Sequence, residues 1–293
     1  MKKLFIILIF VVILSACGFE NQPNDYDIVA TTLPVYDFTS ALCEGTGLQI
    51  GRLVTESVSC LHDYTLQVSQ MRMIEAADTV IISGAGLEEF LDDALHGVGS
   101  IIDASSHVHI HSSEHAEHGH QDEHEHHHDS DPHIWLSPEN AKIMADNICQ
   151  GLVVSYPHYE DIFINNLNTL HDELDKLLQY GNNELSDLSC RDLITFHDGF
   201  AYFAESFDLT ILEAIEEESG SEASAAEIIH LVDLVQKHLL PAVFIEKSGS
   251  DACAGILVAE TDVKLYTLDM AMAGNSYFDA MYHNIDTIKE ALG

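Results

Sequence analysis

Short apolar runs alternate with amphipathic segments along most of this sequence. In its first half, compact apolar runs at 28–32, 48–54 and 79–82 predict strands, bounded by Gly, Pro or polar residues. Helical patterns extend over 35–39, 68–77 and 87–95. A further helix is predicted to start at Ser137-Pro138-Glu139, with serine as N-cap, proline in the first turn and an acidic residue near the positive end. Strands that alternate with helices at this spacing predict a parallel α/β sheet in the first half of the chain.

The second half contains one long helical pattern followed by a second alternation. From about 158 to 180, apolar residues recur near the helical period, which predicts a helix of about 35 Å at about 1.5 Å per residue. Strands are then predicted at 192–196, 209–212, 242–245 and 264–268, and helices at 199–207, 222–238 and 277–292.

The predicted fold is therefore α/β, with two lobes, each a mostly parallel sheet flanked by helices, joined by one long rigid helix. The lobes are expected at 27–156 and 185–293, and the linking helix at 157–184.

The N-terminus has the pattern of an exported protein. Lys2 and Lys3 precede an apolar run at 4–14 that is too short to span a bilayer comfortably, so residues 1–16 are predicted to be a signal peptide. The run ends in LSAC at 14–17, which resembles a bacterial lipobox, and Cys17 is the expected lipidation site. An ordinary signal peptide with a chance cysteine is the alternative. Residues 17–26 would then tether the protein to the extracellular face of the cell membrane.

The charge composition limits which partners the protein can bind, but it does not define the function. The chain has 49 Asp and Glu but only 11 Lys and Arg, and its formal net charge is −38 at pH 7. Such a surface repels phosphate backbones, so we expect no nucleic-acid partner. It would attract cations, but it could equally serve solubility.

Cysteine spacing shows no CxxC motif, which argues against a thiolate zinc site or a redox motif. An exported protein can keep disulfides. The first expected pair is Cys43–Cys60, because these two are close in sequence, and a second candidate is Cys149–Cys190.

A histidine-rich segment interrupts the first lobe at 105–130. It combines ten histidines with Glu, Asp, Ser and Gly, and it has almost no apolar residues after Ile110. Such a composition cannot bury a core, so a mobile loop is predicted. This loop would either collect metal ions at low affinity or serve as a passive linker.

Four residues stand out as candidate metal ligands. His197 and Asp269 directly follow predicted strands of the second lobe, while His62 and His133 lie in loops of the first. Ligands of open α/β sheets bind beyond the carboxyl ends of the strands, so these four side chains could face one cleft.

The motifs around these residues resemble those of the zinc- and manganese-binding lipoproteins of ABC importers. The resemblance is most specific at DPHIWLSP (131–138) and FHDGFAYF (196–203), and it extends to SCLHDY (59–64), Leu268-Asp269 and 277–284. Cys60-Leu61 departs from the usual first motif. The resemblance covers nearly the whole chain after the signal peptide, and the histidine-rich loop before the second motif is typical of the zinc branch.

This resemblance implies a monomeric metal-capturing subunit that works with a membrane permease and an ATPase. His62, His133, His197 and Asp269 would be its ligands. Three imidazoles and one carboxylate fill a tetrahedral zinc site and leave no open position for catalysis. The manganese branch usually has a carboxylate where this chain has His197, so zinc is favoured over manganese.

Two other functions are compatible with the same residues. A surface metal buffer or adhesin without transport would also have a lipid anchor and an acidic surface. A zinc hydrolase would need an open metal position and a general base, for which Glu213, Glu246 or Asp198 would be the candidates.

Overall fold

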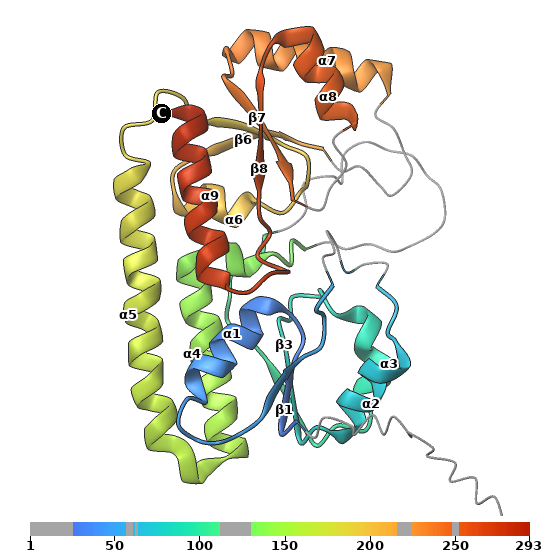
Figure 1. Cartoon of the computed structure of the whole chain (residues 1–293), viewed down its shortest axis with the longest axis vertical. Coiled ribbons are helices and arrows are strands. Elements are labelled where there is room, and N and C mark those ends of the chain that lie inside the picture. The colour runs from blue at the N-terminus through green and yellow to red at the C-terminus, as the bar shows by residue number, and fades with distance from the viewer. Residues whose placement is uncertain (1–25, 57–60, 62–63, 112–129, 216–223, 248–251) are drawn as a thin grey trace, which may run out of the picture.

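Two α/β lobes lie one above the other along a long helix (Figure 1). The computed structural model describes residues 26–56, 61, 64–111, 130–215, 224–247 and 252–293. The 25-residue helix α5 (Glu160–Glu184) packs against α1 of the first lobe and α9 of the second. The predicted fold class is therefore confirmed. The expected signal peptide, Cys17 and residues 112–129 of the histidine-rich segment lie outside the described residues.

The first lobe is built on a four-stranded parallel sheet in the order β2-β1-β3-β4. Its strands are β1 (Ile28–Ala30), β2 (Ile50–Arg52), β3 (Thr79–Ile82) and β4 (Ser100–Asp103). Its helices are α1 (Leu33–Leu42), α2 (Val68–Ala76), α3 (Asp92–Leu95) and α4 (Pro138–Ser155). The buried strands β1 and β3 form its centre.

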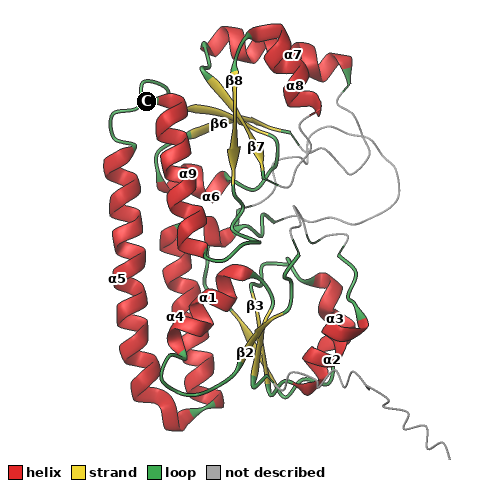
Figure 2. Ribbon diagram, in the orientation of Figure 1, coloured by secondary structure: helices red, strands yellow, loops and turns green. Residues whose placement is uncertain are grey.

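The second lobe, the upper one in Figure 2, also has a parallel four-stranded sheet flanked by helices. The order of its strands is β6-β5-β7-β8. Its strands are β5 (Asp192–Thr195), β6 (Thr210–Ala214), β7 (Ala242–Glu246) and β8 (Lys264–Leu268). Its helices are α6 (Ala201–Ser206), α7 (Ala225–His238), α8 (Ala252–Thr261) and α9 (Tyr277–Leu292). In both sheets the first strand along the chain pairs with the second and the third, so the two lobes share one topology.

Two elements, β4 and α8, were not predicted from the sequence. β4 is a short edge strand in which Ile101 is exposed and Ile102 is buried, so it lacks a compact apolar run. The helix expected over 87–95 is shorter in the structure and consists of a 3-10 turn at Glu89–Leu91 followed by α3.

Helix α4 begins where the sequence predicts a helix start. The Ser137 hydroxyl accepts a hydrogen bond from the Asn140 amide at 3.3 Å, and Pro138 occupies the first helical position. In α5, a Cβ at Gly181 would lie 2.2 Å from the ring of Phe207, the residue that directly follows α6. Only glycine fits that position without a shift of the ring.

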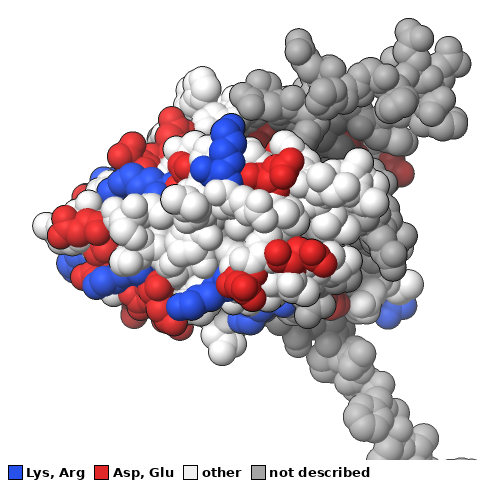
Figure 3. Space-filling view, turned by 90° about the horizontal axis from the view of Figure 1, so that it is seen from above, with Lys and Arg blue, Asp and Glu red and all other residues white. Residues whose placement is uncertain are grey.

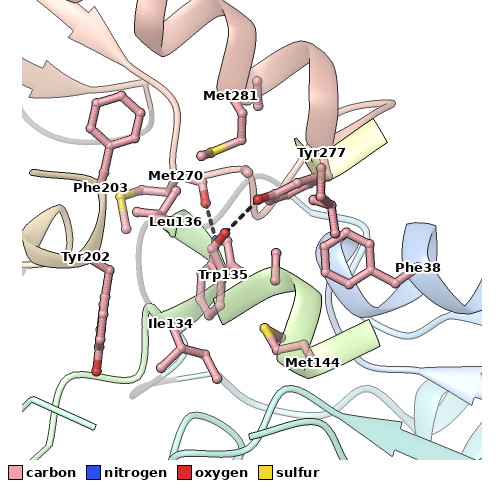
Figure 4. Packing of buried hydrophobic residues seen from close by; sticks show 14 of the residues in the cluster. Phe38, Ile134, Trp135, Leu136, Met144, Tyr202, Phe203, Met270, Tyr277 and Met281 are labelled. Atoms are coloured by element: carbon pink, nitrogen blue, oxygen red, sulfur yellow. Dashed lines mark hydrogen bonds between the residues drawn. The ribbon is translucent and has the colours of Figure 1, made fainter. Parts of the chain in front are cut away.

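Trp135 joins the cores of the two lobes (Figure 4). Its indole Nε1 donates a hydrogen bond to the Met270 carbonyl at 2.8 Å, and the Tyr277 hydroxyl donates one to the Trp135 carbonyl at 2.8 Å. Both aromatic side chains are fully buried. The short 3-10 segment Ile134–Leu136 that leads into α4 is therefore fixed to the second lobe as well as the first.

Both disulfide predictions are wrong, because Cys43, Cys149 and Cys190 are free thiols. Cys149 lies on the buried face of α4 in the first lobe, whereas Cys190 precedes β5 in the second, so the fold separates that pair. Burial raises the pKa of the Cys43 thiol to about 12 and that of Cys149 to about 11. Cys60 lies outside the described residues.

The surface carries both signs of charge despite the acidic composition. Figure 3, which views the end formed by the second lobe, shows Lys and Arg side chains among Asp and Glu around a broad uncharged area. No helix among the described residues has the length and apolarity needed to cross a membrane.

Candidate metal centre

His133 is held rigidly between the lobes. It directly precedes the segment that Trp135 fixes to the second lobe, and only 4 % of its surface is exposed. Its ring packs edge-on against the Trp135 ring, with centroids 5.5 Å apart. A side chain in this position has little freedom to move away from a ligand.

Asp131 orients the His133 imidazole. Its Oδ1 lies 2.8 Å from His133 Nδ1 and also accepts a hydrogen bond from the His133 amide at 2.9 Å. Because a carboxylate accepts hydrogen bonds, we assign the ring proton to Nδ1, which leaves the Nε2 lone pair for a metal ion. Carboxylate–histidine pairs of this kind fix the tautomer and the ring orientation of metal-binding histidines.

His197 faces His133 although 64 residues separate them in the sequence. It follows β5 and lies at the carboxyl edge of the second sheet, as predicted. The two Nε2 atoms are 3.3 Å apart, and the rings are nearly perpendicular at 82°. Two nitrogens bound to one tetrahedral zinc at about 2.0–2.1 Å would be about 3.3–3.4 Å apart. The pair therefore fits one shared ion.

Asp269 is fixed at the end of β8 by its main chain and by one carboxylate oxygen. Asn284 accepts a hydrogen bond from the Asp269 amide and donates one to its carbonyl, both at 2.7 Å. Oδ1 accepts a hydrogen bond from the Ala271 amide at 2.9 Å. Oδ2 lies 3.1 Å from Lys247 Nζ. Oδ2 is thus the carboxylate oxygen that faces the Lys247 ammonium group.

Gly199 shows how tightly this region is packed. A Cβ at that position would lie 2.8 Å from His197 Cδ2, 3.0 Å from His133 Nδ1 and 2.6 Å from Met270 Cε. Met270 follows Asp269 in the chain. Segments from both lobes therefore meet around Gly199, and a larger residue there would displace at least one of the two imidazoles.

The complete four-residue site remains a prediction. His62 lies outside the described residues, so its place relative to the other three is open. Within the described part of the chain, no three His, Cys, Asp or Glu side chains form a group that could hold a metal ion. The structure brings His133 and His197 together, and it places Asp269 beside Met270, whose side chain reaches the same region.

Several residues that support the histidine pair were not predicted from the sequence. Asp131 was overlooked, although a carboxylate two positions before a candidate ligand could have indicated it. Glu246, which we considered only as a general base, is buried with Oε2 3.7 Å from His197 Nδ1. Nothing in the local sequence points to Lys247 or to Tyr202, whose buried hydroxyl donates to the Asp131 carbonyl at 2.9 Å.

The two described ends of the histidine-rich segment meet beside this site. The His111 carbonyl accepts a hydrogen bond from the Asp131 amide at 2.9 Å, and the Tyr202 hydroxyl accepts one from the His111 amide. The His111 ring stacks on the Tyr202 ring with centroids 4.2 Å apart. The described residues on either side of 112–129 are therefore held together at Asp131, the residue that orients His133.

Residues 28–291 match the family model described as zinc-uptake complex component A, periplasmic (ZnuA). The chain is 28% identical to a Treponema pallidum (strain Nichols) protein named for metal binding, over 88% of this chain and 87% of that protein. It is 26% identical to the high-affinity zinc uptake system protein ZnuA of Bacillus subtilis (strain 168), over 99% of this chain and 97% of that protein.

Other relatives are longer than this chain. It is 26% identical to the zinc-binding lipoprotein AdcA of Streptococcus pneumoniae, where the match covers 99% of this chain but 61% of AdcA. Among solved structures, a zinc-bound deletion mutant of ZnuA aligns with a TM-score of 0.77 at 25% identity, over 92% of this chain and 99% of that one.

Two similar α/β lobes on a long helix, with imidazoles from both sides meeting between them, define the class of two-lobed metal-binding substrate-binding proteins that the motifs resemble. Because the family model matches nearly the whole described chain, this protein belongs to the zinc-uptake complex component A (ZnuA) family.

Proposed function

We propose that this protein is the extracellular, lipid-anchored zinc-binding subunit of a metal-import ABC transporter. His62, His133, His197 and Asp269 would bind one zinc ion between the lobes, and the loaded protein would deliver it to a membrane permease driven by an ATPase. Cys17 would carry the lipid anchor, and the protein would act as a monomer. Family membership supports the transport role, since the model it matches is that of a zinc-uptake component.

The observation that carries this proposal is the 3.3 Å separation of the two Nε2 atoms, with the His133 tautomer set by Asp131. Two imidazole nitrogens at this separation would supply half of the ligands of a tetrahedral zinc site. Protonation of either ring would abolish its lone pair, so zinc affinity should fall as the pH drops toward 5.

Capture and release would need no covalent chemistry. Asp131 keeps the proton on His133 Nδ1, and the Trp135 contacts with Met270 and Tyr277 hold this segment against the second lobe. Because α5 packs on both lobes as one continuous helix, closure around the ion should be small and local. We propose no catalytic role.

Zinc is preferred over manganese in this proposal because imidazole nitrogen suits zinc better than it suits manganese. The Bacillus subtilis relative is named for zinc uptake and the Streptococcus pneumoniae relative for zinc binding, which supports the same preference. One relative, from Streptococcus mitis, is named as a manganese ABC transporter lipoprotein at 23% identity. Manganese therefore remains the alternative substrate that an experiment must test.

We further propose that the histidine-rich segment collects zinc for the site. The hydrogen bond between His111 and Asp131 places both of its described ends beside His133. Without residues 112–129, import from scarce zinc should be slower while the affinity of the central site is unchanged. Equal import by the deletion variant would instead mean that the segment is a passive linker.

The first test is metal content and competition on residues 26–293 with 112–129 replaced by a short glycine linker. This deletion is feasible because His111 and Asp131 are already hydrogen-bonded, and it removes histidines that would obscure the stoichiometry. One tightly bound zinc ion, lost in His133→Ala and His197→Ala, is expected. His171→Ala is the matched control, since His171 pairs with Asp146 outside the site. If the protein prefers manganese, the proposed substrate is wrong, and if it binds no metal tightly, the proposed site is wrong.

A further inference from the structure

Lys247 occupies the part of Asp269 that a metal ion would need. Of the two carboxylate oxygens, Oδ1 is bound by the Ala271 amide and Oδ2 lies 3.1 Å from Lys247 Nζ. The proposed function requires Asp269 to bind zinc through an oxygen, and Oδ2 is the one that no main-chain amide of the described residues contacts. The ammonium group and a zinc ion therefore compete for the same atom.

The two partners of this ion pair differ in their freedom to move. The Asp269 side chain is 13% exposed, and its main chain is held by two hydrogen bonds to the buried Asn284. The Lys247 side chain is 65% exposed. A lysine head group on a flexible four-carbon stem can leave for solvent at little cost. When the pair separates, the carboxylate stays in place and the lysine moves.

We propose that Lys247 is a displaceable counter-cation of the metal site. It neutralises Asp269 in the metal-free protein, is displaced when zinc binds, and returns to Oδ2 as zinc leaves. Lys247 thereby lowers zinc affinity and speeds release, which suits a protein that must hand its ion to a permease. This inference rests on the proposed function, because it takes Asp269 as a zinc ligand.

A purely structural ion pair would behave differently. If Lys247 only held the Asp269 side chain in position, its removal would loosen the carboxylate and weaken zinc binding. A competitor gives the opposite sign, since its removal exposes a carboxylate that Ala271 and Asn284 still hold. The direction of the change in affinity therefore separates the two roles.

Lys247→Met is the variant that tests this proposal, measured in the chain from residue 26 with its histidine-rich segment intact. Zinc alone is the probe. Affinity for the tightest zinc is measured by chelator competition, and its release by the rate of extraction into excess chelator. Exposed ion pairs contribute little, so we expect roughly two- to fivefold tighter binding and correspondingly slower extraction.

Two matched variants serve as controls. Lys264→Met removes the same charge at the start of β8, five residues before Asp269. At about 3.3 Å per residue, Lys264 lies about 16 Å from Asp269, so the zinc affinity of this variant should match that of the wild type. Lys247→Arg keeps a cation beside Asp269 and should also stay close to the wild type.

The outcomes distinguish this inference from the function beneath it. If the wild type holds zinc tightly and loses it in Asp269→Ala, but Lys247→Met binds zinc equally or more weakly, the counter-cation role is wrong and the transport proposal stands. An equal gain in Lys264→Met would also overturn the role, because the effect would then be one of net charge. If the wild type holds no zinc, both proposals fail.

Discussion

Removing the carboxylate behind His133 should weaken zinc binding although Asp131 is not itself a proposed ligand. In Asp131→Ala, His133 Nδ1 loses its 2.8 Å partner, so the imidazole can adopt the other tautomer or rotate. Loss of a partner that orients a metal-binding histidine typically costs about 10- to 100-fold in affinity. That corresponds to about 1.4–2.7 kcal/mol of binding free energy.

The structure places this variant toward the upper end of that range. The side chains of His133 and Asp131 are only 6% and 10% exposed, so water cannot readily replace the lost acceptor. Asp131→Asn should show a smaller loss, because the amide oxygen can still accept the Nδ1–H bond while the negative charge is gone. The order of affinities should therefore be wild type, then Asn, then Ala.

Chelator competition for the tightest zinc ion measures this effect, and thermal unfolding of the metal-free proteins checks that each variant folds. Asp175→Ala is the matched control, because Asp175 is an exposed carboxylate paired with Lys142 and its loss changes the net charge equally. If folded Asp131→Ala binds zinc within about twofold of the wild type, the tautomer assignment behind His133 is wrong.

Three further predictions concern selectivity, stability and packing. His197→Glu should weaken zinc relative to manganese in a competition assay, and unchanged relative affinities would count against His197 as a ligand. Burial raises the pKa of Glu88 from 4.5 to about 7, despite hydrogen bonds from Thr31, Ser83 and Gly84, so the fold favours the protonated carboxyl. The contribution of the protonated Glu88 carboxyl to the free energy of unfolding is therefore complete below pH 4.5 and is lost as the pH rises through about 7. The loss amounts to up to about 3 kcal/mol. Urea unfolding of Glu88→Gln at several pH values should lack this part of the wild-type pH dependence. Gly181→Ala should lower the melting temperature, because its Cβ would lie 2.2 Å from the Phe207 ring, and an unchanged melting temperature would show that this ring can shift without cost.

Local patterns determined the secondary structure where each element carries its own signal. The apolar period of α5 and the Ser137-Pro138 start of α4 are properties of neighbouring residues, so both helices could be predicted without tertiary contacts. The carboxyl-end positions of His197 and Asp269 follow from the strands that precede them. β4 could not be found in this way, because its exposed Ile101 and its ends on Ser100 and Asp103 give no compact apolar run.

Motif resemblance identified His133 and His197 separately, but the 3.3 Å approach of their Nε2 atoms depends on how the two lobes pack. Trp135 contributes to that packing through its hydrogen bond to Met270, 135 residues away, and no local pattern encodes such a contact. The same reason explains the wrong disulfide predictions and the missed Lys247–Asp269 pair. The sequence thus determined which residue types are available and where elements begin and end, whereas long-range packing decided which side chains meet and with what charge beside them.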